Sequence, residues 1–313
     1  MLNAARKLEP PVISVVVFVL NAAETIRKAL ESVTSADQPA VELLVLDGGS
    51  TDGTLDVIRE FEPKIAYWRS VHDGSAVLAL NEGVKRATGD IICLLPADDW
   101  VEPGGLQAVR EQFRNDPGLE ILCCGTRVVR FDRNGSLRVD LDFTDPRVLE
   151  FSMANIVRYP LTTSRFVLRR LYNELGEYDA SLRYANDLDF LIRLLLRRPR
   201  AKVLPQLVYN YRRHAGSRIQ GGDPRILMEL MRDFVRIAER YLSDSRISAA
   251  ERRALRELHG RSSVRLAWML LCRGHVKDAG HVLARATQLN WLFPIFVPIW
   301  LARKLLRRGL PTA

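Results

Sequence analysis

Three short apolar runs, separated by segments of helical periodicity, constrain the fold of this chain more than any other feature. The runs lie at residues 12–20, 41–46 and 91–95. Between them, apolar side chains recur every three to four residues at 22–33 and 54–61, which is the spacing of a helix with one buried face. Strand–helix–strand units of this length predict an α/β fold built on a mostly parallel sheet with helices on both faces.

The rest of the chain adds further elements to this pattern. A helix is predicted at 81–87, and Asn134-Gly135 between two apolar runs is typical of a hairpin. The last third reads as helical throughout. It has an apolar stripe over 227–241 and a pair of antiparallel helices that turn at Gly274.

Acidic residues follow two of the predicted strands. Asp47 comes directly after the run at 41–46, and Asp98 and Asp99 come shortly after the run at 91–95. Open parallel sheets bind their ligands beyond the carboxyl ends of the strands. The sequence therefore predicts a ligand site at that edge, with carboxylates in it.

The octet D-G-G-S-T-D-G-T at 47–54 is the strongest local motif. The Asp47 carboxylate could accept hydrogen bonds from a base N–H or a ribose hydroxyl, and the glycines let the backbone approach a ligand closely. The alternative is a plain turn in which Ser50 or Thr51, with Asp52, caps the next helix. The octet is not G-x-G-x-x-G and has no P-loop lysine, so it indicates neither a dinucleotide nor an ATP motif.

Asp98 and Asp99 form a second acidic motif, in L-L-P-A-D-D-W. Two carboxylates at the end of a buried strand repel each other unless a cation lies between them. Oxygen ligands of this kind suit Mg²⁺ or Mn²⁺, and such an ion can bridge the phosphates of a nucleotide diphosphate. The alternative is an exposed turn whose aspartate caps a helix at Glu102.

A third acidic motif, N-D-L-D at 186–189, opens a helical segment. Aspartate at a helix start is most often a cap or a partner of the helix dipole. It becomes a candidate general base only if the fold directs it at the same cleft.

Taken in order, these motifs resemble those of the family 2 glycosyltransferases over about residues 12–218. The set is V-V-V-F-V-L-N-A-A-E-T, the octet, H-D-G-S followed by A-T-G-D, L-L-P-A-D-D-W, and L-R-Y-A-N-D-L-D-F-L-I-R-L. The resemblance implies a GT-A type, Rossmann-like fold and a nucleotide-sugar donor, usually a UDP-sugar. It also implies a Mg²⁺ or Mn²⁺ cofactor and inversion of the anomeric centre by a single displacement with an aspartate base.

The resemblance assigns roles to individual residues. Asp187 corresponds to the catalytic base, with Asn186 in the position of the usual glutamate, and Asp99 corresponds to the metal ligand. Asp189 is then structural or faces the acceptor. The residues implied to bind the nucleotide sugar are Asp47, Ser50, Asp73, Asn81, Asp98 and His214.

Two other functions remain open from the sequence. Leu78, where relatives often have an aspartate, and Thr163, in place of a frequent His-Gln, favour a degenerate glycosyltransferase that only binds a nucleotide sugar or glycan. A nucleotidyltransferase is the other alternative, although no Gly-rich turn with a nearby Arg or Lys lies close to Asn21.

Charge divides the chain into two parts. The net charge is +9, yet residues 1–224 carry 29 Lys+Arg against 30 Asp+Glu, whereas residues 225–313 carry 17 against 7. We therefore predict a catalytic domain at 1–224 and a basic helical region at 225–313 with an anionic partner. Few aromatic residues interleave with these charges and no nucleic-acid motif is recognised, so a membrane surface is favoured over nucleic acid.

The tail supplies the candidate membrane contact. Residues 291–302 are apolar, carry a tryptophan at or near both ends and are interrupted by two prolines, and four basic residues follow. A span needs about 20 apolar residues, so a monotopic anchor at 291–308 is predicted. The alternative is packing against the catalytic domain or a second subunit. Four cysteines without a C-x-x-C pair are typical of reduced thiols in a cytosolic protein. Together with the tail, the resemblance to family 2 glycosyltransferases implies a cytoplasmic enzyme, peripheral at the inner face of the cell membrane, that makes envelope glycan or exopolysaccharide.

Overall fold

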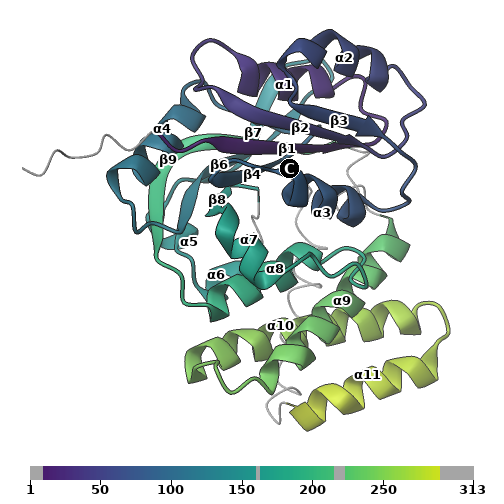
Figure 1. Cartoon of the computed structure of the whole chain (residues 1–313). Coiled ribbons are helices and arrows are strands. Elements are labelled where there is room, and N and C mark those ends of the chain that lie inside the picture. The colour runs from purple at the N-terminus through teal and green to yellow at the C-terminus, as the bar shows by residue number, and fades with distance from the viewer. Residues whose placement is uncertain (1–9, 160–162, 215–222, 290–313) are drawn as a thin grey trace, which may run out of the picture. The chain divides into compact units, whose positions relative to one another are not determined.

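A computed structural model describes residues 10–159, 163–214 and 223–289 (Figure 1). The chain forms two compact units. The first comprises residues 1–151, 161–180 and 193–214, and the second comprises 152–160, 181–192 and 215–313. The predicted anchor at 291–308 lies outside the described residues.

The first unit is built on a sheet of nine strands in the order β3-β2-β1-β4-β8-β6-β9-β5, with β7 paired to β6 (Figure 1). Neighbouring strands are parallel from β3 to β4. The bounds of these four strands are Tyr67–Ser70 for β3, Val41–Asp47 for β2, Ile13–Val19 for β1 and Ile91–Pro96 for β4. The predicted α/β fold is confirmed. The four-residue β3, half-buried along its length, was not predicted because it lacks a long apolar run.

The other half of the sheet mixes strand directions. β8 is antiparallel to β4 and β6, β6 is parallel to β9, and β5 is antiparallel to β9. The predicted hairpin is present between β6 and β7, and Gly135 adopts a φ of 76° in its turn. The bounds are Trp100–Val101 for β5, Ile121–Phe131 for β6, Leu137–Phe143 for β7, Arg165–Leu168 for β8 and Ala201–Arg212 for β9.

Helices flank this sheet. α1 buries Ile26, Ala29, Leu30 and Val33, the side chains that its periodicity predicts. α3 begins before the predicted 81–87, because the Ser75 hydroxyl accepts a hydrogen bond from the N–H of Val77 and so caps an earlier start. The bounds are Ile26–Thr34 for α1, Thr54–Phe61 for α2, Glu62–Lys64 for a 3-10 turn, Ala76–Arg86 for α3, Gly105–Asn115 for α4, Pro146–Leu149 for α5 and Arg169–Leu175 for α7.

The second unit is helical, as the sequence predicts. α10 packs against α6, α9 and α11. Gly274, with a φ of 79°, makes the predicted turn between α10 and α11. The bounds are Met153–Arg158 for α6, Pro224–Leu242 for α9, Ala249–Leu271 for α10 and Val276–Leu289 for α11, while α8, Asn186–Leu196, begins in this unit. Among the described residues, no helix is both long and apolar enough to cross a membrane.

Gly83 sets how closely α3 can pack on the sheet. A Cβ atom at this position would overlap Val16 Cγ1 and lie 2.9 Å from Leu46 Cδ2, two side chains of the buried strands. We predict that Gly83→Ala lowers the free energy of unfolding by about 1–3 kcal/mol, even though alanine is the better helix former.

The matched control is Gly280→Ala in α11, where a Cβ atom would meet nothing within 4 Å. Its free energy of unfolding should rise by up to about 1 kcal/mol through helix propensity alone. Denaturant unfolding of both variants measures the difference. A Gly83→Ala protein as stable as the parent would show that α3 does not pack in this way.

Candidate active site

The loops that follow β1 and β2 are joined by hydrogen bonds at the carboxyl edge of the sheet. Asn21 adopts a φ of 49°, a left-handed conformation that asparagine tolerates better than most residues. Its N–H donates to Ser50 Oγ at 2.7 Å, and its Oδ1 accepts from the N–H of Thr51 at 2.9 Å. The N–H of Ala22 donates to Thr54 Oγ1 at 2.8 Å. The turn at 47–54 is therefore held in one conformation.

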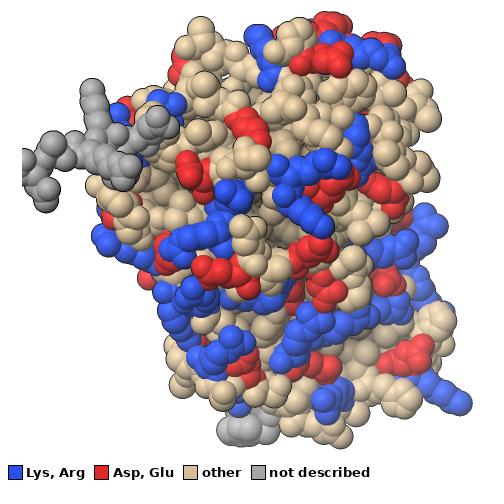
Figure 2. All heavy atoms as spheres, in the orientation of Figure 1, with Lys and Arg blue, Asp and Glu red and all other residues tan. Residues whose placement is uncertain are grey.

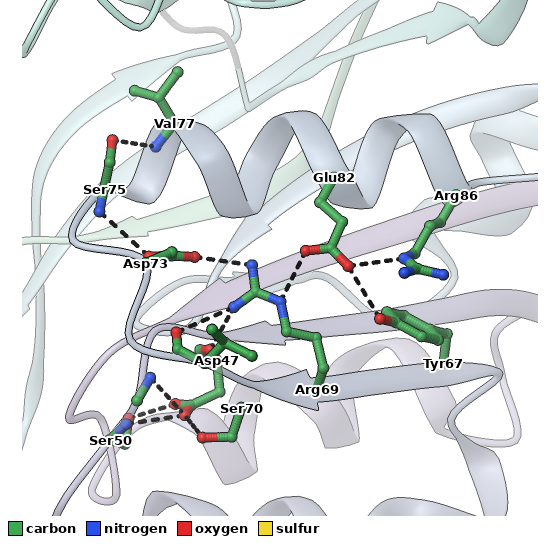
Figure 3. Close-up of polar contacts among 12 residues, drawn as sticks. Asp47, Ser50, Tyr67, Arg69, Ser70, Asp73, Ser75, Val77, Glu82 and Arg86 are labelled. Carbon is green, nitrogen blue, oxygen red and sulfur yellow. Dashed lines mark hydrogen bonds and ion pairs between the residues drawn. The ribbon is translucent and has the colours of Figure 1, made fainter.

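The Asp47 carboxylate is the centre of that turn (Figure 3). It is fully buried and accepts four hydrogen bonds. The donors to Oδ2 are the N–H groups of Gly49 at 3.0 Å and Ser50 at 2.9 Å and the hydroxyl of Ser70 at 2.6 Å, while the Ser50 hydroxyl donates to Oδ1. Most of the acceptor capacity of Asp47 is thus used inside the turn.

The alternative, in which Ser50 or Thr51 with Asp52 caps the next helix, holds only for Asp52. Its Oδ1 accepts from the N–H of Thr54 at 3.0 Å at the start of α2, where the N-cap residue itself is Gly53. Ser50 Oγ instead donates to Asp47 and accepts from the N–H of Asn21.

Arg69 links the turn to the segment that carries Asp73 (Figure 3). Its Nη1 donates to the carbonyl oxygen of Asp47 at 2.8 Å, its Nη2 lies 2.8 Å from Asp73 Oδ2, and its Nε lies 2.9 Å from Glu82 Oε2. Burial alone would lower the pKa of Arg69, but the hydrogen bonds that it donates to Asp73 and Glu82 outweigh burial and raise that pKa. Sequence reasoning missed Arg69, because an arginine in a short strand carries no motif.

The side-chain amide of Asn81 makes two hydrogen bonds to the backbone of one residue. Its Nδ2 donates to the carbonyl oxygen of Tyr178 at 3.0 Å, and its Oδ1 accepts from the N–H of the same residue at 2.9 Å. Both ends of the amide therefore tie α3 to the segment after α7, and a role in binding the nucleotide sugar stays a prediction.

The structure brings Asp98, Asp99 and His214 together. Asp99 is buried and accepts hydrogen bonds from the Tyr209 hydroxyl at 2.6 Å and from the N–H of Arg212 at 2.8 Å. Asp98 is partly exposed, and its Oδ2 lies 3.0 Å from His214 Nε2. The partners on β9 were not predicted, since β9 returns to this edge from far along the chain.

The charged form of Asp99 is disfavoured in this position. Burial, followed by the charge of the neighbouring Asp98, raises the pKa of Asp99 well above its ordinary value. A cation beside the carboxylate would stabilise it. The carboxylate oxygens of Asp98 and Asp99 are ligands that suit Mg²⁺ or Mn²⁺, although no cluster of three or more metal-ligating side chains occurs among the described residues.

Asp187 and Asp189 lie in the first turn of α8, within the second unit. Asp187 is half-buried, and its Oδ1 accepts from the N–H of Leu188 at 2.7 Å. Asp189 is buried, and its Oδ1 accepts from Arg240 Nη1 and from the Tyr241 hydroxyl, both at 2.8 Å. The two aspartates therefore differ, because the carboxylate of Asp189 is held by α9.

A parallel sheet whose carboxyl edge carries a buried aspartate turn and an Asp-Asp pair, continued by a half of mixed strand direction, is similar to the GT-A type fold of the solved structures described below. Residues 14–175 match the family model described as glycosyl transferase family 2. The chain belongs to that family.

Relatives agree with this assignment. The chain is 24% identical over 216 residues to the uncharacterized glycosyltransferase EpsJ of Bacillus subtilis, covering 66% of this chain and 62% of that protein. It is 30% identical over 190 residues to the uncharacterized glycosyltransferase Rv1514c of Mycobacterium tuberculosis, covering 59% and 70%. The match thus spans less than two thirds of the B. subtilis protein.

Solved structures share the fold. Staphylococcus aureus TarS 1–349 in complex with UDP-GlcNAc superposes with a TM-score of 0.58 at 18% identity, covering 88% of this chain and 91% of that one. The mannosyltransferase PcManGT of Pyrobaculum calidifontis, in complex with GDP-Man and Mn²⁺, gives a TM-score of 0.56 at 19% identity, covering 96% and 82%.

The raised pKa of Asp99 leads to a prediction about stability without metal. The charged form is disfavoured in the fold, so the wild type loses stability as pH rises from the ordinary value of 3.8 towards the raised one. Asparagine cannot ionise, yet it can accept from the N–H of Arg212 and donate to Tyr209. In EDTA, the Tm of Asp99→Asn minus that of the wild type should therefore grow as pH rises above the ordinary value of 3.8 and level off once pH passes the raised pKa of Asp99.

The same variant tests the cation site directly. Mn²⁺ with UDP should raise the Tm of the wild type and leave that of Asp99→Asn unchanged. A Tm difference that does not change with pH would contradict the electrostatic account, and an equal Mn²⁺ shift in both proteins would place the ion elsewhere.

Proposed function

We propose that the protein is an inverting glycosyltransferase. It transfers a sugar from a nucleotide diphosphate donor, a UDP-sugar, to a glycan or lipid-linked acceptor in the synthesis of envelope glycan or exopolysaccharide. The observation that carries this proposal is the buried Asp99 with Asp98 and His214 beside it, at the ligand-binding edge of a family 2 fold. The complexes of similar structures with UDP-GlcNAc and with GDP-Man and Mn²⁺ support it.

In this proposal the donor lies along the carboxyl edge of the first unit. Asp47 and Ser50 fix the turn that faces the base. Asp47 retains acceptor capacity on Oδ1, which accepts only the Ser50 hydroxyl within the described part of the chain. Asp73, oriented by Arg69, contributes on the nucleotide side. Asn81 supports α3 behind these groups through Tyr178.

Asp99 would hold Mg²⁺ or Mn²⁺, with Asp98 and His214 next to it. A bound cation supplies positive charge that balances the diphosphate as it leaves. The imidazole of His214, already in contact with Asp98, is placed to donate to a phosphate oxygen at the same edge.

Asp187 is the proposed base. Its carboxylate takes the proton of the acceptor hydroxyl, whose oxygen forms a bond to the anomeric carbon. On the opposite side, the bond from that carbon to the diphosphate oxygen breaks, and the electron pair leaves with the nucleoside diphosphate. One displacement of this kind inverts the anomeric configuration, and a carboxylate in this role contributes roughly 10²- to 10⁴-fold in rate.

The proposed organisation is a catalytic domain at 1–224 and a basic helical region at 225–313. Figure 2 shows Lys and Arg side chains spread over the second unit. Arg225 in α9, Arg246 between α9 and α10, and Arg285 in α11 are more than half exposed. Such a surface is drawn to anionic lipid. We propose peripheral binding at the inner face of the cell membrane, where a lipid-linked acceptor would be met. One relative, a Mycobacterium bovis protein 31% identical over 189 residues, is described as a PGL/p-HBAD biosynthesis glycosyltransferase.

The role of Asp187 is tested by Asp187→Asn. The variant should lose at least about 100-fold in kcat, because the proton of the acceptor has no base to accept it. UDP affinity, measured by calorimetry, should stay close to that of the wild type, since the substitution is isosteric and lies outside the donor-binding groups. Wild-type transfer by Asp187→Asn together with an inactive Asp189→Asn would show that the base is misassigned.

A further inference from the structure

Helix α9 contacts the segment that precedes α8 through a buried carboxylate. Asp233 is 3% exposed, and its Oδ2 accepts hydrogen bonds from the N–H of Tyr184 at 2.8 Å and of Ala185 at 3.3 Å. Two consecutive N–H groups thus converge on one carboxylate, and hydrogen bonds to a charged acceptor are stronger than neutral ones.

A second contact lies on the same face of α9, about two turns further on. Arg240 Nη1 and the Tyr241 hydroxyl both donate to Asp189 Oδ1 at 2.8 Å. Asp189 is 1% exposed, so this pair is shielded from solvent on the carboxylate side. Residues seven apart share a helix face. A single rigid helix therefore presents Asp233 and the Arg240–Tyr241 pair to two points of one short segment.

Asp187 lies between these two contacts. One contact is made two to three residues before it and the other is made two residues after it. The first turn of a helix lacks intrahelical partners for its N–H groups and frays readily. External bonds on both sides remove that freedom from the turn that carries Asp187.

We infer that α9 is a brace for the proposed catalytic base, and that Asp233, Arg240 and Tyr241 are positioning residues. The inference rests on the proposed function, in which Asp187 takes the acceptor proton. A base works only when it is held close to its productive geometry, and a displacement of about 1 Å can cost 10²-fold in rate. The helical region would then contribute to catalysis through α8, in addition to its proposed membrane contact.

A matched pair of arginine variants tests the brace in the full-length protein. Arg240→Gln removes the contact to Asp189, whereas Arg232→Gln removes a surface pair with Glu229 on the same helix. The two arginine side chains have the same exposed fraction, 40%. Tyr241→Phe removes one hydroxyl and serves as the mildest change. Arg240→Lys restores a positive charge without the guanidinium geometry.

We expect Arg240→Gln to lower kcat about 10- to 100-fold while the KM for the donor stays within about twofold of the wild-type value, since donor-binding groups are untouched. Tyr241→Phe should lower kcat less, Arg240→Lys should recover part of the loss, and Arg232→Gln should behave as wild type. Hydrogen exchange should quicken at the amides of 183–189 in Arg240→Gln and in Asp233→Asn.

A purely structural role predicts a different pattern. Loss of active protein with unchanged kcat per folded molecule, or equal effects of Arg240→Gln and Arg232→Gln, would overturn the inference. So would unchanged exchange at 183–189. If the wild type transfers no sugar from any donor, the proposed function has failed, and with it the link to catalysis, while the exchange measurement decides separately whether α9 holds this segment.

Discussion

The buried carboxylate of Asp47 is the interaction on which the donor edge of this protein depends. Four hydrogen bonds from the turn and from β3 satisfy it, and the same turn is bonded through Ser50 to the loop after β1. Arg69 then connects the carbonyl of Asp47 to Asp73. Because a buried carboxylate is costly unless its oxygens are paired, this network fixes the ends of β1, β2 and β3 relative to each other.

Asp99 shows the opposite use of a buried carboxylate. It has two hydrogen-bond donors and an acidic neighbour, and its pKa is raised by burial and by that neighbour. Asp47 is arranged for stability, whereas Asp99 is arranged so that a cation would be favourable. A perturbed carboxyl group in a ligand-binding edge is a common sign of a functional site, and this contrast is the physical basis of the proposed function.

The sequence predicted three of the four strands of the parallel half, the hairpin at Asn134-Gly135 and the helix pair at Gly274, since each depends on local periodicity or on turn residues. It could not predict β3, β9 or the contacts of α9. Arg69, Tyr209 and Arg240 bind aspartates that lie between 22 and 110 residues away in the chain. Such contacts are set by tertiary packing, which local patterns do not encode. The motifs thus identified the candidate aspartates, whereas the hydrogen-bond partners of each aspartate follow only from the tertiary structure.

The most direct test of the central claim is release of nucleoside diphosphate from a panel of UDP- and GDP-sugars with Mn²⁺ or EDTA. It is measured without added acceptor, so that water takes the place of the acceptor hydroxyl and the sugar is released by hydrolysis. Wild-type protein should release UDP from at least one UDP-sugar in Mn²⁺, and release should fall to background in EDTA and in Asp99→Asn. No release from any donor, or the same release in EDTA as in Mn²⁺, would contradict a metal-dependent glycosyltransferase.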